Sequence, residues 1–273
     1  MIQRGLSSPT AAVYVKYDPE DPPPHPGPSW TRFVCISDTH SHIYQIPPGD
    51  VLLHAGDLSA GGALKRLKVT LDWLKTLPHP IKIFIAGNHD LCLDEDWQEG
   101  GYWANRSGEV IRRRDTLAAR QLVRDVSLRE SGTHYLQFES MDITTSAGRT
   151  WKVYGSPAAP RHSCGAFQYE YNHGKEIYAR IPEGTEILLT HTPPYGTLNK
   201  TRKGAAAGCK DLARRLASDD LRQCRLHVFG HIHESHGAVL QEETRSSELT
   251  HGRVSVNAAL AYGGQAVIVD LQN

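Results

Sequence analysis

The sequence lacks any apolar run long enough to cross a membrane, and residues 1–17 lack the apolar core of a secretory signal peptide. Cysteine is also scarce, with five residues in 273, an odd number that includes no CxxC pair. That pattern disfavours both a disulfide framework and a thiolate zinc site. We therefore expect reduced thiols in a cytoplasmic protein that has no membrane partner.

The chain has no excess of charge either, because its 30 basic and 30 acidic residues cancel. A protein without net charge has no general attraction to nucleic acid or to an anionic membrane surface. We therefore expect a small-molecule substrate and no nucleic-acid partner. Histidine, in contrast, is abundant at 15 residues, and several of these fall in the motifs described below.

Proline is concentrated in one segment, residues 18–28, which reads DPEDPPPHPGP. Such a segment cannot be helical and lacks backbone donors for a sheet interior. We expect residues 1–29 to form an extended, proline-rich arm on the surface of a single domain that spans residues 30–273.

Beyond this arm, apolar and amphipathic segments alternate. Five apolar segments predict buried strands, namely Phe33–Ser37, Val51–His54, Ile81–Ala86, Ile187–Leu189 and Leu226–Phe229. Helices are expected at 63–77, 116–130 and 209–217, the second with Leu117, Leu122 and Val126 on its buried face. Segment 157–182 reads as mostly loop, and short strands are expected near 134–138, 151–155, 236–240, 252–256 and 266–270. This order predicts an α/β fold of two packed mixed sheets with helices outside.

Polar side chains follow each of the five predicted buried strands. They are Asp38 and His40, then Asp57, then Asn88 to Asp90, then His191, and finally His231 and His233. In open α/β sheets, ligands bind at the carboxyl ends of the strands. One histidine after a strand is more often a capping or core group than a ligand. That explanation would have to hold after all five strands. The repetition therefore favours a two-metal hydrolytic site built from hard and borderline ligands.

The spacing within the motifs indicates which side chains act together. Side chains two residues apart point the same way in extended chain, so Asp38 and His40 can bind one ion, and His231 and His233 lie on one face. Asp57 has two carboxylate oxygens and can bridge two cations, which partly cancels their repulsion.

His89 and Asp90 suit catalysis better than metal ligation. His89 follows Asn88, a neutral ligand, and must point elsewhere. Asp90 is expected to hold the His89 ring by a hydrogen bond and to favour its protonated form. The alternative is that His89 only orders its loop.

The order of motifs DTH, GD, GNHD, TH and GHIH resembles the calcineurin-like metallophosphoesterase superfamily. Flanking segments resemble its metallophosphoesterase domain-containing branch, which includes cyclic-nucleotide phosphodiesterases: ISDTHS at 36–41, GDVLLHAGD at 49–57, VYGSP at 153–157, THTPP at 190–194 and LHVFGHIHESHG at 226–237. The resemblance covers residues 30–271. It implies a four-layer α/β/β/α sandwich.

The resemblance also implies a ligand set for two divalent metal ions. The first ion is bound by Asp38, His40, Asp57 and His233, and the second by Asp57, Asn88, His191 and His231. Mixed His, Asp and Asn ligation suits Mn, Fe or Zn better than Ca. A metal-bridging hydroxide is the expected nucleophile, with His89 stabilising or protonating the leaving oxygen.

We expect a phosphodiesterase, and several alternatives stay open. They are a phosphomonoesterase, a pathway enzyme that uses the dinuclear site on a carbonyl or ester substrate, and a metal-poor interaction scaffold. His162 and Phe167 are expected to contact substrate, and the backbone at Cys209 is expected to bind a phosphate at a helix start. The branch typically has a tryptophan where this chain has Ala166. This difference disfavours a pocket for a cyclic nucleotide.

Overall fold

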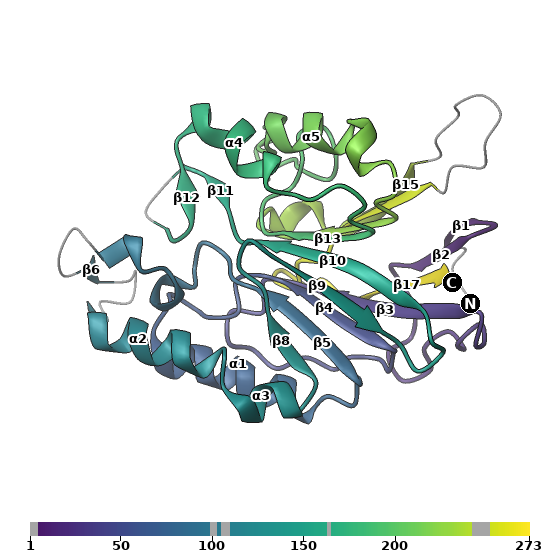
Figure 1. The fold of residues 1–273 in the computed structure, drawn as a ribbon, viewed down its shortest axis with the longest axis horizontal. Helices are drawn as coiled ribbons and strands as arrows, with labels where there is room; N and C mark the ends of the chain where they lie inside the picture. Colours follow the sequence, from purple (N-terminus) through teal and green to yellow (C-terminus); the bar gives the residue numbers. More distant parts are fainter. Residues whose placement is uncertain (1–4, 99–102, 105–109, 163–164, 242–251) are drawn as a thin grey trace.

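Two β-sheets lie face to face in the computed structural model, which describes residues 5–98, 103–104, 110–162, 165–241 and 252–273 (Figure 1). Within these residues, the first sheet has seven strands in the order β1-β2-β17-β3-β4-β5-β8. Their bounds are β1 Leu6–Ser8, β2 Ala11–Tyr14, β17 Val267–Gln272, β3 Trp30–Ile36, β4 Val51–Ala55, β5 Ile81–Ile85 and β8 Thr133–Tyr135. The strands from β3 to β8 run parallel, whereas β17 is antiparallel to both of its neighbours.

The second sheet has six described strands in the order β15-β16-β14-β13-β10-β9. Their bounds are β15 Gly237–Gln241, β16 Arg253–Asn257, β14 Leu226–Phe229, β13 Ile187–Thr190, β10 Thr150–Ser156 and β9 Glu139–Thr144. The four inner strands are parallel, and an antiparallel strand closes each edge. Both sheets are therefore mixed, as the sequence predicts.

Helices cover the outer face of each sheet. The first sheet is covered by α1 Leu64–Thr76, α2 Arg113–Leu122 and α3 Val126–Glu130, and the second by α4 Gly174–Ala179 and α5 Lys210–Leu216 (Figure 1). The predicted α/β/β/α sandwich is thus confirmed. The helix α4 lies within segment 157–182, which we expected to be mostly loop. Among the described helices, none combines the length and the apolar character needed to cross a membrane.

Short elements complete the description. They are the strands β6 Trp103–Ala104, β7 Val110–Ile111, β11 Ala159–Pro160 and β12 Gln168–Tyr169, and the 3-10 turns η1 Leu91–Leu93, η2 Asp96–Gln98, η3 Tyr171–His173, η4 Asp219–Leu221 and η5 His233–Ser235.

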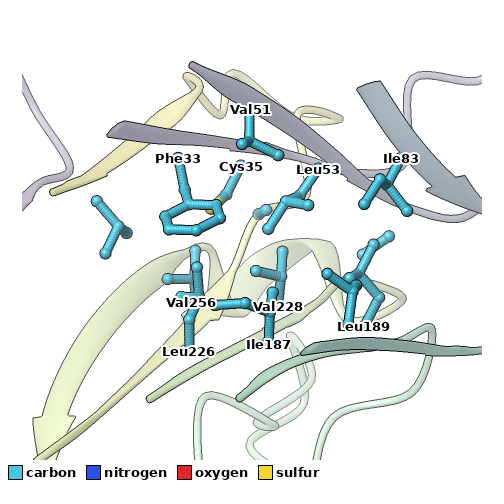
Figure 2. Close-up of a cluster of buried hydrophobic side chains, with 14 of the residues drawn as sticks. Phe33, Cys35, Val51, Leu53, Ile83, Ile187, Leu189, Leu226, Val228 and Val256 are labelled. Carbon is cyan, nitrogen blue, oxygen red and sulfur yellow. The ribbon is translucent and has the colours of Figure 1, made fainter. Parts of the chain in front are cut away.

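The largest part of the core lies between the two sheets. Figure 2 shows Phe33, Cys35 and Leu53 from the first sheet pointing toward Leu226 and Val228 from the second. The alternate residues of the same strands face the helices, so the central strands are buried on both faces. Strands buried on both faces read as continuous apolar runs rather than as alternating ones. For this reason the central strands are recognisable in the sequence.

The N-terminal region differs from the expected arm. Strand β2 pairs with β17 inside the first sheet, and Ala11 and Val13 belong to the core between the sheets. Residues 1–29 are therefore not a separate arm. Only the proline-rich part crosses the surface, where the Arg32 guanidinium donates to the carbonyl oxygens of Pro23 and Pro24.

The predicted helix 116–130 is two helices, and of its predicted buried face only Leu122 packs against the core. The chain turns after α2, and α3 begins at a new N-cap, where the Asp125 side chain accepts a hydrogen bond from Ser127 N–H at 2.8 Å. Leu117 and Val126 are 54% and 57% exposed. The break resets the helical phase, so one periodic stripe cannot continue through both helices.

Candidate metal centre

The loops after five parallel strands meet at one rim of the sandwich. Strands β3, β4 and β5 of the first sheet and β13 and β14 of the second each end just before one of the polar motifs. Parallel strands have their carboxyl ends at the same edge of a sheet, so both sheets deliver their motifs to this rim.

Four side chains form the first half of the site. The donor atoms of Asp38, His40, Asp57 and His233 all lie within 4.8 Å of one another. The Nε2 atoms of His40 and His233 are 3.3 Å apart, and His233 Nε2 is 3.0 Å from Asp38 Oδ1. One ion at about 2.1 Å from each donor fits atoms at such separations. This group could hold a metal ion.

The second half of the site shares Asp57 with the first. His191 Nε2 lies 3.4 Å from Asp57 Oδ1 and 3.0 Å from Asn88 Oδ1, whereas Asp57 Oδ2 faces His40 Nε2 at 3.9 Å. The His231 ring packs against the His191 ring with 5.0 Å between centroids. The single carboxylate of Asp57 therefore faces both halves of the site.

His191 shows the arrangement expected of a metal-binding histidine. Its Nδ1–H donates to the Ala55 carbonyl oxygen at 2.9 Å, which fixes the ring and turns Nε2 toward the site. Ligating histidines usually donate their other ring nitrogen in this way. The donor set also contains no thiolate, since Cys35 points into the core between the sheets (Figure 2). Divalent cations such as Mn, Fe or Zn fit these residues.

The backbone at the site adopts a rare conformation. Asp38, His40, Asp57 and His231 have positive φ angles of 54°, 46°, 55° and 67°. Left-handed backbone at residues with a Cβ persists only where the surrounding structure imposes it, and it gathers at functional sites. The expectation of extended chain at these pairs is therefore wrong. In particular, His233 turns toward Asp38 while His231 packs on His191, so the two side chains face different halves of the site.

Two motif glycines are required by close packing against ligands from other motifs. A Cβ at Gly87 would overlap Asp57 Oδ1, and a Cβ at Gly230 would overlap Asp38 Oδ2. The motifs GNHD and GHIH thus begin with glycine because each loop passes directly over a carboxylate. This interlocking explains why the glycine precedes the polar residues.

The pKa values of Asp57, His191 and His231 depend on one another's charge. Burial raises the pKa of Asp57, but His191 outweighs burial and holds that pKa well below its ordinary value. Burial lowers the pKa of His191, yet the Asp57 carboxylate raises it overall to about 9. Burial, followed by the charge of His191, lowers the pKa of His231 to about 3, so His231 keeps a free lone pair. Without a cation, a proton on His191 therefore neutralises Asp57.

Two buried residues outside the predicted ligand set, His54 and Asn257, support the ligand loops. Gly56 N–H donates to His54 Nδ1 at 3.3 Å, so His54 Nε2–H donates to Thr39 Oγ1 at 2.9 Å. Asn257 Nδ2–H donates to the carbonyl oxygens of Ile232 and Leu198 at 2.9 and 3.1 Å. For His54, a polar residue inside the otherwise apolar strand β4 was the available signal.

The role expected for Asp90 is wrong. Its buried carboxylate accepts from the N–H groups of Leu58, Ser59 and Gly87 and from Ser59 Oγ–H. Both Asp90 and His89 are described, and no hydrogen bond joins the carboxylate to the His89 ring. Asp90 fastens the GD loop to the GNHD loop instead. The His89 ring stands beside His40, with 4.9 Å between centroids.

Of the three expected substrate contacts, one lies at the site. The exposed His162 ring is 4.9 Å from the His231 ring, centroid to centroid. Phe167 packs instead against the core beneath the first sheet's helices, and its N–H donates to Asp94. Cys209 is buried against α4 and α5, and its N–H donates to the Pro193 carbonyl oxygen. That amide is thus not available to a phosphate.

The sequence matches the profile described as calcineurin-like phosphoesterase over residues 31–235, three quarters of the chain and all five motifs. The chain belongs to the calcineurin-like phosphoesterase family. It is therefore a hydrolase of phosphoric ester bonds. The alternative of an interaction scaffold without hydrolase activity is not supported. The solved structure of TT1561 from Thermus thermophilus has the same fold, with a TM-score of 0.50 at 11% identity over 83% of this chain and 88% of that one.

Two curated relatives of this phosphoesterase show how far the similarity extends. Human metallophosphoesterase domain-containing protein 1 is 34% identical over 251 residues, which cover 89% of this chain and 72% of that protein. Probable rhamnogalacturonate lyase C of Emericella nidulans is 37% identical over 206 residues, 76% of this chain. The match spans only 17% of the length of the Emericella protein.

Proposed function

We propose that the protein hydrolyses phosphodiesters of small molecules with two divalent metal ions, of which Mn is the first candidate. One observation carries the proposal: the two oxygens of Asp57 face opposite halves of a mixed donor set, toward His40 at 3.9 Å and toward His191 at 3.4 Å. A carboxylate in that position supports a bridging role. The donor atoms around it support one cation on either side.

The two donor groups support an assignment of ligands. The first ion would be held by the cluster of Asp38, His40, Asp57 and His233, and the second by Asp57, Asn88, His191 and His231. When bound, such a pair of cations activates a water molecule near neutral pH and neutralises charge on phosphoryl oxygens.

His89 is proposed as the residue that acts on the leaving oxygen. Its backbone N–H donates to Asp57 Oδ1 at 2.7 Å, which fixes the residue directly over the site. Its ring is half-buried beside His40, and a ring nitrogen there can give a proton to the leaving oxygen or stabilise its charge. His162 stands on the other side, next to His231, where it can contact the phosphoryl group.

The decisive experiment compares ester classes on protein loaded with Mn. Turnover of bis(4-nitrophenyl) phosphate should exceed turnover of 4-nitrophenyl phosphate, and elemental analysis should find close to two metal ions per chain. Asp57→Asn should lose at least one ion and most activity, because an amide cannot offer two anionic oxygens. Faster turnover of the monoester would replace the diesterase assignment. Protein that binds no metal on loading with Mn and hydrolyses neither ester would overturn the proposed function.

We also propose a cytoplasmic location, which the free thiols support. Cys35, Cys92, Cys209 and Cys224 are buried and unpaired, and Cys164 lies outside the described residues. Fractionation of cells should recover the protein with cytoplasmic enzymes, and recovery from a secreted fraction would contradict the proposal.

A further inference from the structure

We propose that Arg202 and Tyr262 recognise the organic part of the substrate, and that this part is a planar group with a negative charge of its own. The inference rests on the proposed function, because it places the group beside a phosphoryl bound at the metal centre. Neither residue belongs to a motif of the predicted site. Both lie at the rim, on the side of His233.

Tyr262 presents its ring to solvent directly beside a candidate ligand. The ring is edge-on to the His233 imidazole with 5.0 Å between centroids, yet the residue is 72% exposed. Its φ angle is +64°, a left-handed conformation that is unfavourable for a tyrosine. An exposed aromatic ring in strained backbone next to the centre offers a stacking surface for a planar group.

Arg202 brings a cation to the same ring. Its guanidinium carbon lies 5.3 Å from the Tyr262 ring centroid, within cation–π range. Its Nε is 3.8 Å from Glu234 Oε1, which is an ion pair but too long for a hydrogen bond. Among the described residues these are its contacts, and the side chain is 73% exposed. The donor fork is therefore open to an anion.

The position of Arg202 is fixed by the loops that carry the ligands. Ser235, two residues after His233, donates its Oγ–H to the Lys200 carbonyl oxygen at 2.7 Å. Asn257 Nδ2–H donates to the Leu198 carbonyl oxygen at 3.1 Å and also to the GHIH loop. The basic segment at 200–203 is thus fastened to the candidate metal site. It does not behave as a separate surface loop.

The local charge favours an anion over a neutral group. Lys200, Arg202 and Lys203 are all exposed on this segment, and the acidic Glu234 pairs with Arg202. A phosphate or a carboxylate on the substrate, one aromatic ring away from the reacting phosphorus, would meet the guanidinium while the ring stacks on Tyr262. Either anion satisfies the same chemistry.

The test measures binding of two inert ligands to full-length, Mn-loaded protein by calorimetry. Phenylphosphonate and 4-carboxyphenylphosphonate share the phosphonate and the ring and differ in the added charge. Wild type should bind the carboxylated ligand more tightly. Arg202→Ala should lower the affinity for that ligand about tenfold and leave the affinity for phenylphosphonate within about twofold of wild type. Tyr262→Leu should lower the affinity for both ligands by about threefold or more, whereas Tyr262→Phe should lower neither affinity.

Matched controls separate these effects from general ones. Arg214→Ala removes an exposed arginine of α5, and Tyr171→Leu removes an exposed aromatic ring; both should bind like wild type. Equal affinity of wild type for the two ligands, or equal weakening of both by Arg202→Ala, would overturn the inference while leaving the proposed function intact. If metal-loaded wild type binds neither ligand, the proposed function fails and this inference fails with it.

Discussion

At the scale of single residues, the centre is defined by what each carboxylate faces. Asp57 reaches two donor groups through its two oxygens, whereas Asp90, from the next motif along the chain, is enclosed by donors from two loops. Burial, together with the charge of Asp57, raises the pKa of Asp90 to about 6. Two aspartates from neighbouring motifs thus differ in role because one faces the site and the other faces backbone.

His89 offers the sharpest test at this scale. His89→Ala should lower kcat by about a hundredfold or more, which is typical when a proton-transfer group is removed. Metal content should stay at the wild-type level, because the side chain lies beside the ligands and its backbone N–H, which bonds Asp57, is retained. Kinetics and elemental analysis on the same preparation check both parts.

A loss of bound metal in His89→Ala would place His89 among the ligands and contradict its assignment. His89→Gln serves as the matched variant, since it restores size and polarity without an ionisable ring.

At the scale of elements, β2 and α3 show how packing departs from local pattern. Strand β2 extends the first sheet beyond β17 although its sequence is short and isolated ahead of a proline-rich segment. Helix α3 begins at a polar cap, and its first residue is turned to solvent. Pairing partners and helix phase depend on neighbours that are distant in sequence.

Two valines test these placements with one type of substitution. Val13 is fully buried between the sheets, so Val13→Ala should lower the free energy of unfolding by about 2 kcal/mol. Val126→Ala, at a mostly exposed position, should change it by less than about 0.5 kcal/mol. Urea unfolding of both variants gives the comparison. Interpretation of the sequence alone, with an N-terminal arm and Val126 on a buried face, predicts the reverse order.

At the scale of the whole molecule, the ligand loops rest on a sandwich that holds several histidines in their neutral form. Burial lowers the pKa of His54 and of His79 to about 4, and burial also lowers the pKa of His227 well below its ordinary value. In the fold these rings stay neutral at a pH well above 4, whereas after unfolding they take up a proton near the ordinary pKa of 6.5. The metal-free protein should therefore be sensitive to acid.

The sign and window of this effect follow from the pKa values. A folded pKa of about 4 against an ordinary 6.5 means that the contribution of His54 is complete above pH 6.5 and is lost as pH falls toward 4. The neutral His54 alone should make the free energy of unfolding about 2 kcal/mol lower at pH 5 than at pH 7. His191, whose pKa is raised to about 9, acts in the opposite direction, and its contribution is lost as pH rises from 6.5 through 9.

Unfolding of chelator-treated protein in urea at pH 5, 7 and 9 measures these losses. His54→Gln should flatten the acid limb, whereas His173→Gln, at an exposed turn, should leave it unchanged. An acid limb that is as steep in His54→Gln as in wild type would contradict the assignment.

Local sequence is sufficient to predict the layers and most residues of the centre. The central strands are buried on both faces and therefore appear as continuous apolar runs, and the polar motifs follow them directly, so Asp38, Asp57, Asn88 and His191 could be placed at one rim. Which groups touch, in contrast, depends on how the folded chain packs. Packing assigned β2 to the sheet and turned Asp90 away from His89. It also placed Phe167 against the core, buried Cys209, and brought Tyr262 to His233 and Arg202 to Tyr262. These contacts join segments far apart in the chain through left-handed turns and loop packing, and no local periodicity encodes them.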